Sequence, residues 1–308
     1  MSSSSPVESP PTTPRPATEQ RAFDAGDWSL FIAVSVLWGA SFLLIAQSLD
    51  AFTPGVVTLG RVGLGACTLL ALRLRLAPGQ RIEAADRSRV VVLALVWVAV
   101  PFTLFPLAQQ WINSAVAGLL NGATPVLVSI VSVVAFGVAP RRIQTIGLVV
   151  GFAGIALVAL GSAGEGSSEL RGVLLVLGAT VCYGVAINLA PPLQARYGAV
   201  VLMSTVLAVA TVAVAPLALI DLRANEWRLS SALALLVLGA VGTGVAYWIM
   251  SSLVGRVGSI RASFITYVIP IVSLLLGVAV RDDRVTVLAL VGAPITIVGA
   301  FLAGRRSD

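Results

Sequence analysis

The chain carries two copies of one apolar unit, related by a constant shift of 145 residues. The shift brings landmark residues into register: Trp38 with Tyr183, Ser114 with Ser259, Pro125 with Pro270, Gly147 with Gly292, and Gly154 with Gly299. One offset holds over more than a hundred residues without a gap, which indicates an internal duplication. Whatever the first copy folds into, the second copy is expected to fold into again.

The repeated unit is too apolar for a soluble domain. Hydrophobic residues make up 57% of the chain, charged residues 11%, and the mean hydropathy is +0.97, whereas about a quarter of the residues in soluble domains are charged. Ten continuous apolar runs are each long enough to cross a bilayer: 28–48, 54–74, 90–108, 113–137, 142–161, 172–190, 198–220, 231–254, 259–280 and 285–303. We predict an all-α integral membrane protein with ten transmembrane helices.

The domain organisation follows from the repeat. A Ser/Pro/Thr-rich segment, 1–26, is predicted to be a disordered cytoplasmic tail. The first copy is assigned to 27–161 and the second to 170–304. Each copy holds five spans, and five is odd, so the second copy must enter the membrane in the opposite sense. Two inverted repeats with a site near the midplane between them are typical of secondary transporters, which work by alternating access.

The arginines predict the orientation of the chain. All 20 basic residues are arginine, and fourteen of them lie in the tails and loops that share a side with the N-terminus. Five lie on the other side: Arg171, Arg223, Arg228, Arg281 and Arg284. Positive residues favour the cytoplasmic side, so we expect an inner-membrane protein with both termini in the cytoplasm. The arginines are scattered at span ends, which argues against a nucleic-acid surface.

Several short motifs occur in a recognisable order. The first span carries Trp38-Gly39-Ala40-Ser41-Phe42, and the second carries Arg61. A Ser-x-x-Ala…Pro pattern occurs twice, as Ser114, Ala117 and Pro125 and as Ser259, Ala262 and Pro270. In this order, over residues 28 to 303, the chain resembles the EamA-type branch of the drug/metabolite transporter superfamily. The resemblance implies a transporter, with export expected, for metabolites, amino acids or amphipathic drugs.

One departure from the family pattern concerns a turn. Members usually have Gly-Glu-Arg after the fourth and ninth spans. Asp283-Arg284 matches that turn in kind after the ninth span, but the fourth is followed by Val138-Ala139-Pro140-Arg141, which has no acid. We interpret this turn as structural, so its loss affects loop anchoring more than function.

Arg61 is the leading candidate for a binding residue, because it is the only charge placed away from the ends of a predicted span. It lies on the order of 10 Å into the bilayer, where a charge usually faces a cavity or a partner. The planar guanidinium suits a carboxylate, which predicts an anionic or zwitterionic solute. The structural alternatives are snorkelling, pairing with Asp50, or capping of carbonyls on a neighbouring span. Arg61 aligns with Val206, so the first copy is expected to do most of the binding.

No predicted span contains an aspartate or glutamate, and the chain has no histidine. A proton-coupled exporter generally needs such a group within the membrane. We therefore expect facilitated diffusion or exchange, or coupling through an acid near the membrane surface such as Asp50.

Polar and aromatic side chains within the spans could line a cavity for amphipathic solutes. The further binding candidates are Trp38, Asn121, Tyr183, Asn188, Tyr247, Trp248 and Tyr267, with Ser41, Thr243, Ser263 and Thr266 in the same polar set. The alternative role is helix–helix hydrogen bonding, worth about 0.6 kcal/mol in a membrane. Pro125 and Pro270 are predicted to kink their spans as hinges or as shape elements.

Enzyme motifs do not occur: there is no P-loop, no Cys/His metal set and no nucleophile–histidine pair. We expect no enzymatic activity, no cofactor and no metal, with a small-molecule solute and the lipid bilayer as partners. Two alternatives stay open. One is a sugar-phosphate or nucleotide-sugar exchanger, which usually needs several buried basic residues. The other is a non-transporting scaffold or lipid-handling subunit, which would tolerate substitution of Arg61.

Overall fold

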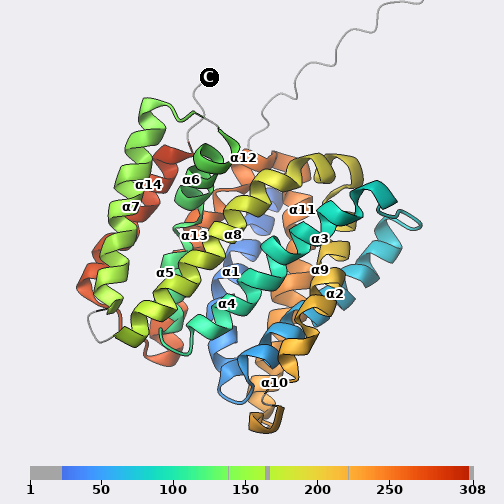
Figure 1. Ribbon diagram of the computed structural model, residues 1–308, viewed down its shortest axis with the longest axis horizontal. Coiled ribbons are helices and arrows are strands. Elements are labelled where there is room, and N and C mark those ends of the chain that lie inside the picture. Colours follow the sequence, from blue (N-terminus) through green and yellow to red (C-terminus); the bar gives the residue numbers. More distant parts are fainter. Residues whose placement is uncertain (1–22, 138, 164–166, 221, 305–308) are drawn as a thin grey trace, which may run out of the picture.

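A computed structural model describes residues 23–137, 139–163, 167–220 and 222–304. This described part is helical wherever it has regular structure (Figure 1). The first copy contains α1 (Ala25–Leu49), α2 (Pro54–Leu76), η1 (Ala84–Asp86), α3 (Arg87–Leu93), η2 (Ala94–Ala99), α4 (Val100–Ala108), α5 (Ser114–Asn121), α6 (Thr124–Phe136) and α7 (Arg142–Ala163). The second contains α8 (Ser167–Tyr197), α9 (Ala199–Ala218), η3 (Leu222–Ala224), α10 (Leu229–Leu236), η4 (Val237–Val245), α11 (Ala246–Val257), α12 (Ser259–Ala262), α13 (Ile265–Arg281) and α14 (Val287–Ala303).

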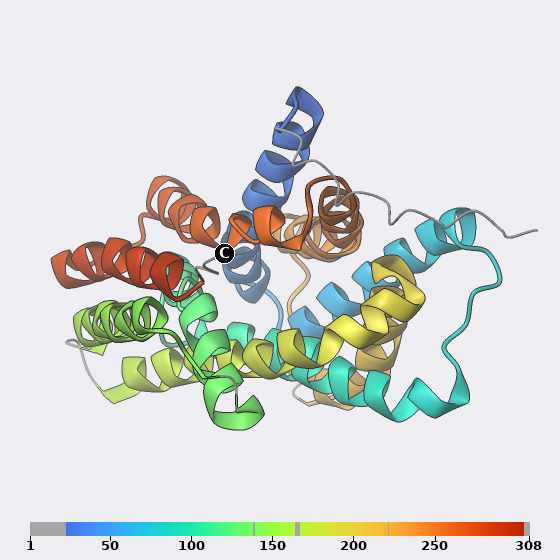
Figure 2. The same ribbon diagram turned by 90° about the horizontal axis from the view of Figure 1, so that it is seen from above.

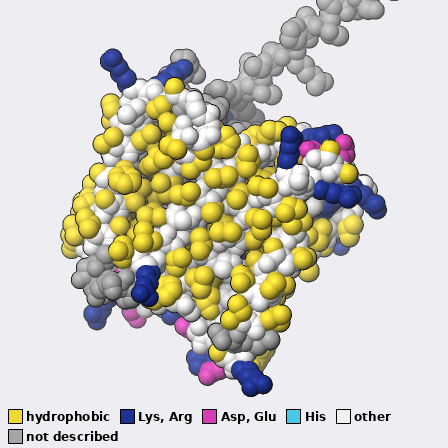
Figure 3. Space-filling view, in the orientation of Figure 1, with side chains coloured by type: hydrophobic (Ala, Val, Ile, Leu, Met, Phe, Trp, Pro, Cys, Tyr) yellow, Lys and Arg dark blue, Asp and Glu magenta, His cyan; other side chains and the backbone are white. Residues whose placement is uncertain are grey.

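The helices have the length and composition of membrane spans. Among the described residues, seven helical stretches are long and apolar enough to cross a bilayer, and the bent pair α5–α6 makes an eighth. The helices α13 and α14 are apolar but shorter, with 17 residues each. The all-α membrane fold is thus confirmed, while the count of ten spans stays a prediction. Hydrophobic side chains cover most of the face in Figure 3, and charged ones gather near both ends.

The first helix begins before its predicted span. Asp24 caps α1: its carboxylate accepts a hydrogen bond from the Asp27 N–H at 2.7 Å, and the Asp27 carboxylate accepts one from the Asp24 N–H at 3.1 Å. This reciprocal capping box satisfies two N–H groups of the helix start. The predicted disordered tail is therefore wrong for its last two residues, which belong to α1, and residues 1–22 lie outside the described part.

The longer helices also change the prediction that no acid lies within a span. Asp27 is 1% exposed in the first turn of α1, and Asp86 is 3% exposed at the start of the apolar stretch that runs to Ala108. Both carboxylates are paired with arginine: Asp27 with Arg256 at 2.6 Å, and Asp86 with Arg196 at 2.7 Å. The expected absence was wrong at the span ends, because the helices start earlier than their apolar runs.

The two copies pack as inverted equivalents. The helix α1 contacts α10, η4, α11 and α13, and its equivalent α8 contacts α3, η2, α4 and α6. The helix α7 runs along α14, and these two are themselves equivalent (Figures 1 and 2). Their contacts are reciprocal. A Cβ on Gly147 would lie 2.7 Å from the Gly299 carbonyl oxygen, and one on Gly292 would lie 2.7 Å from that of Gly154.

The reciprocity of this glycine contact shows that the helices are antiparallel. Gly147 faces Gly299 near the end that carries the first and last described residues, and Gly154 faces Gly292 one step further along. The 145-residue shift converts one contact into the other, as a two-fold axis between α7 and α14 requires. Only glycine allows backbones to approach this closely, a common basis of packing in membranes.

Both spans with a repeat-related proline are broken. The helices α5 and α6 meet at a 41° bend, three residues before Pro125, which lies in the first turn of α6. In the second copy the break between α12 and α13 comes earlier, and Pro270 lies inside α13. Proline removes one backbone N–H donor, which accounts for a helix restarting at this place. The bend near Pro125 agrees with the expected kink, while a hinge role for either proline stays a prediction.

Candidate functional site

The embedded arginine is buried at the contact between the two copies. Arg61 on α2 is 7% exposed. Its guanidinium carbon lies 3.8 Å from the centroid of the Phe102 ring on α4, and its Nε donates a hydrogen bond to Thr243 Oγ1 on η4 at 3.3 Å. Among the described residues its two terminal nitrogens donate no hydrogen bond. The planar fork therefore keeps its donors available for a carboxylate or a similar anion.

Small residues let η4 approach α2 closely enough to hold Arg61. A Cβ on Gly239 would lie 3.1 Å from the Arg61 carbonyl oxygen, and one on Gly65 would lie 2.7 Å from Thr243 Cγ2. The Thr243 hydroxyl donates to the Leu238 carbonyl at 3.0 Å, five residues back. Its proton is thereby engaged, so its lone pairs accept from Arg61. The π-helical turn and the glycines together fix the guanidinium in place.

Four aromatic residues around Arg61 form two repeat-related pairs. Phe102 is equivalent to Tyr247, and Trp38 is equivalent to Tyr183, under the shift of 145 residues. Arg61 is within electrostatic range of both tyrosines, and the rings of Trp38 and Tyr247 meet edge to face at 5.7 Å. We call these five residues the arginine–aromatic cluster. Each copy contributes two rings, so the cluster lies where the copies meet.

The two π-helical segments are also repeat-related. The shift moves η2 (Ala94–Ala99) onto residues 239–244, which lie within η4. Segment η2 packs on α9, just as η4 packs on the equivalent helix α2. π-Helical turns are rare and are found frequently at functional sites. Each copy thus carries one π-helical segment, and each segment packs against the second span of the other copy.

The remaining candidates lie apart from the arginine–aromatic cluster. Asn121 accepts hydrogen bonds from Thr124 at the end of α5. Asn188 bonds Gly184 and Ser132 and lines a separate groove of about 450 Å³ between α3 and α8. Trp248 is 36% exposed, and Tyr267 donates to the Ala300 carbonyl at 3.2 Å against α14. The structure assigns these four residues no contact with Arg61.

Two residues that hold Arg61 in place were not leading candidates from sequence. Phe102 was missed, although the shift from Tyr247 points directly to it. Thr243 was only one of several polar residues within the spans. The expectation that the first copy does most of the binding stays a prediction; the second copy supplies the acceptor for Arg61 Nε and both tyrosines. Within the described residues, no group of three or more metal-binding side chains comes together.

The acid proposed as a partner for Arg61 is engaged elsewhere. Asp50 forms a bidentate ion pair with Arg281, at 2.9 and 3.2 Å. At the same end, the Asp283 carboxylate accepts from Ser114 Oγ at 2.6 Å and from the Ala115 N–H at 2.9 Å, which caps α5. This contact supports the structural interpretation of the turn after the ninth span. Both interactions tie the first copy to the second.

Comparison with known proteins agrees with this architecture. The model of the EamA-like transporter family matches the chain twice, over residues 28–160 and 170–305. An uncharacterized transporter of Archaeoglobus fulgidus is 23% identical, and the match covers 91% of this chain and 99% of that protein. The uncharacterized transporter YdfC of Bacillus subtilis is 22% identical over 85% and 86% of the two chains. A solved crystal structure superposes with a TM-score of 0.63 at 21% identity, over 91% of this chain and 97% of the other, which shows the fold.

The family match spans both copies and leaves out the segment that joins them. It coincides with the repeat, with the inverted packing of the helices and with the resemblance read from the motifs. The chain therefore belongs to the EamA-like transporter family.

Proposed function

We propose that the chain is a secondary transporter of the cell membrane that exports small organic solutes by alternating access. The solute would carry an anionic group, held by Arg61, and an apolar or aromatic body against the four rings. Metabolites, amino acids and amphipathic drugs with a carboxylate fit this description. The two inverted copies would rock against one another around the arginine–aromatic cluster.

One observation carries this proposal. Arg61 is buried within the membrane-spanning part, yet its terminal nitrogens donate no hydrogen bond to a described residue. An arginine that only stabilised the fold would be expected to satisfy those donors with carbonyls or a carboxylate, because an unpaired buried charge is costly. A transported anion would satisfy them during part of the cycle.

The coupling mechanism is proposed to be facilitated diffusion or exchange, or coupling to an acid at a span end. Arginine does not release its proton. Asp27, Asp50 and Asp86 all lie at span ends in ion pairs. A stoichiometric proton flux that persists when each of these acids is replaced by asparagine would contradict this mechanism.

The test of the function is flux in proteoliposomes. Purified protein is assayed for uptake and efflux of amino acids, carboxylate drugs and cationic dyes, with and without a pH gradient. We expect carboxylate-bearing solutes to be moved, Arg61→Ala to abolish the flux, and Arg61→Lys to reduce it strongly, because lysine lacks the fork. Thermal stability of each variant serves as the folding control. Full flux by a folded Arg61→Ala variant would contradict the proposed role of Arg61, and the absence of flux for every solute in the panel would favour the scaffold alternative.

The proposed orientation places both termini in the cytoplasm. The first and last described residues lie at the same end of the helices (Figure 1), as this orientation needs. Fusion of green fluorescent protein to the C-terminus should give fluorescent cells, and fusion of alkaline phosphatase should give inactive enzyme. The reverse pattern would contradict the orientation.

A further inference from the structure

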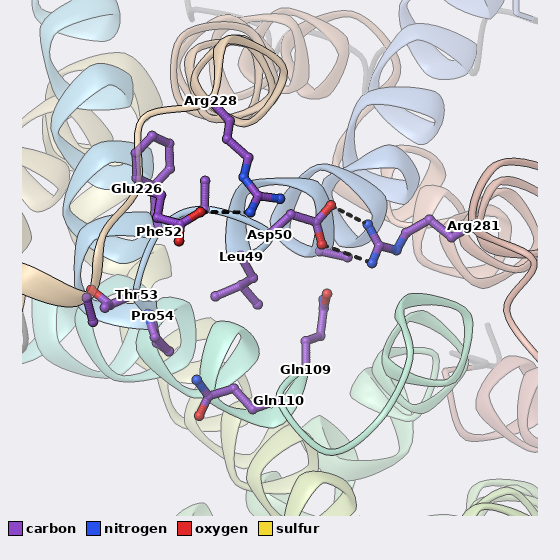
Figure 4. Close-up of a pocket in the computed structure, with 13 residues that line it drawn as sticks. Leu49, Asp50, Phe52, Thr53, Pro54, Gln109, Gln110, Glu226, Arg228 and Arg281 are labelled. Carbon is purple, nitrogen blue, oxygen red and sulfur yellow. Dashed lines mark hydrogen bonds and ion pairs between the residues drawn. The ribbon is translucent and has the colours of Figure 1, made fainter.

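A polar cavity lies at the opposite end of the molecule from the first and last described residues. It has a volume of about 500 Å³, within the size range of small-molecule sites. Asp50, Gln109 and Gln110 line it from the first copy, and Glu226, Arg228 and Arg281 line it from the second (Figure 4). We call this cavity the vestibule. Arg61 is not among its lining residues, so it is distinct from the arginine–aromatic cluster.

The charges of the vestibule are balanced. Asp50 forms its bidentate pair with Arg281, and Arg228 donates to Glu226 at 2.7 Å. All four side chains keep water contact, with exposures from 31% to 68%. A purely anionic ligand would meet two carboxylates here, and a purely cationic ligand would meet two guanidinium groups. The lining therefore favours a ligand that presents both signs of charge close together.

One amide in the vestibule has no partner. Both Nε2 and Oε1 of Gln109 are shielded from solvent, and among the described residues neither makes a hydrogen bond. Figure 4 shows the side chain directed toward the Asp50–Arg281 pair. Thr53 also lines the cavity, and its Oγ1 is buried without a hydrogen-bond partner among the described residues. A shielded polar group without a partner destabilises the protein, and a ligand that carries a donor and an acceptor would relieve this cost.

We propose that the vestibule is a binding subsite for zwitterionic groups. The ligand's ammonium would bind Asp50 and Gln109 Oε1, and its carboxylate or phosphate would bind Arg281 and Gln109 Nε2. The ion pair between Asp50 and Arg281 is thereby replaced by two, one between Asp50 and the ligand's ammonium and one between Arg281 and the ligand's anion. No charge is left unpaired. Free amino acids carry this chemistry, and so does the head group of phosphatidylethanolamine. The inference rests on the proposed function only in taking the bound zwitterion to be a solute on its transport path.

Binding is tested separately from transport. The protein is placed in nanodiscs of phosphatidylglycerol, which has no ammonium group, and binding of L-leucine and L-glutamine is measured by saturation-transfer NMR. Their methyl esters are cationic and their N-acetyl forms are anionic. We expect the zwitterions to bind at least tenfold more tightly than either derivative. Equal binding of all three forms, or no binding of the zwitterions, would overturn the proposal.

Variants locate the binding in the vestibule. Gln109→Leu should weaken zwitterion binding roughly tenfold, as expected for lost hydrogen bonds to charged groups, while Gln80→Leu at the other end should have no effect. Gln109→Glu should shift the preference toward the methyl esters, which tests the site even if the leucine variant folds poorly. Arg61→Ala removes the other proposed carboxylate site, and in that background the binding that remains should still depend on Gln109. Insensitivity to both Gln109 variants would place the binding elsewhere and refute the subsite.

Two further comparisons distinguish a free solute from a lipid head group as the ligand, and binding in the vestibule from transport. If nanodiscs with phosphatidylethanolamine block L-leucine binding and Gln109→Leu abolishes the block, the lipid head group is the occupant. If binding depends on Gln109 but no solute is moved, the transport proposal fails and the subsite stands. If flux depends on Arg61 but not on Gln109, and no zwitterion binds, the transport proposal stands and the subsite fails.

Discussion

The guanidinium of Arg61 lies over the ring of Phe102, with 3.8 Å between the guanidinium carbon and the ring centroid. The ring attracts the guanidinium through the quadrupole of its π system, and this attraction uses none of the hydrogen-bond donors of the guanidinium. The arginine can thus be held in the membrane while its fork remains free to bind a solute. A carboxylate in the place of Phe102 would hold the arginine as well, but would compete with an anionic ligand.

Replacement of Phe102 should therefore weaken the site without unfolding the protein. We expect Phe102→Leu to reduce the apparent affinity for carboxylate solutes about 2- to 30-fold, in line with a cation–π contribution of about 0.5–2 kcal/mol. Phe102→Tyr keeps the ring and should keep the affinity. Phe152→Leu removes a ring that is 60% exposed and serves as the control. Concentration-dependent flux in proteoliposomes measures all three, and an unchanged affinity in Phe102→Leu would contradict the role.

Thr243 should matter through its hydroxyl. Thr243→Val removes the acceptor for Arg61 Nε, and a hydrogen bond to a charged group contributes about 1.5–3 kcal/mol. We expect at least a tenfold loss of solute affinity, with recovery in Thr243→Ser. The matched control is Thr103→Val, since that hydroxyl donates only to the Ala99 carbonyl of its own helical stretch, at 2.7 Å. Equal effects of the two valine variants would show that Thr243 acts only through helix packing.

The glycine contact between α7 and α14 should be intolerant of a methyl group. A Cβ at position 299 would overlap the Gly151 backbone nitrogen and Cα. Gly299→Ala should therefore lower the thermal midpoint, with an overpacking cost of about 1–3 kcal/mol. In contrast, a Cβ on Gly255 in α11 meets nothing within 4 Å, and Gly255→Ala should be neutral or stabilising. A stable Gly299→Ala variant would mean that the two helices separate readily.

The ion pair between Asp27 and Arg256 should contribute more stability than a surface pair. The Asp27 side chain is 2% exposed and also completes the capping box of α1. Asp27→Asn leaves Arg256 without its close partner and should lower the thermal midpoint by several degrees. The exposed pair of Glu226 and Arg228 is the comparison, because such pairs contribute about 0–1 kcal/mol. Similar midpoints for Asp27→Asn and Glu226→Gln would contradict this ranking.

The sequence predicted the fold well because the membrane imposes it. Every backbone polar group in a bilayer needs an internal partner, so each long apolar run has to become a helix. The apolar runs did not predict where the helices begin. Polar residues such as Asp27 and Asp86 extend the helices beyond the runs through capping and ion pairs. The breaks near Pro125 and Pro270 could be anticipated, but not the one-turn difference between the copies.

The site was predicted only in part. Arg61, Trp38, Tyr183 and Tyr247 were identified and do come together, because repeat-related positions meet at the axis between the copies. Trp248 and Tyr267 lie apart from the cluster, and this could not be predicted, since the direction of a side chain around a helix depends on packing that an all-apolar run does not reveal. The π-helical segments η2 and η4 left no pattern in composition. They become visible only once the backbone of both copies is compared.

The reciprocal contact between α7 and α14 has the geometry of an isologous dimer interface, in which identical surfaces meet across a two-fold axis. A five-helix protein inserted in both directions would form it from two copies of Gly147 and Gly154. Such a homodimer would also bring two arginines toward one axis, where like charges repel strongly in a medium of low dielectric constant. Joining the halves in one chain removes that constraint, because Val206 occupies the second position and a single guanidinium remains at the centre.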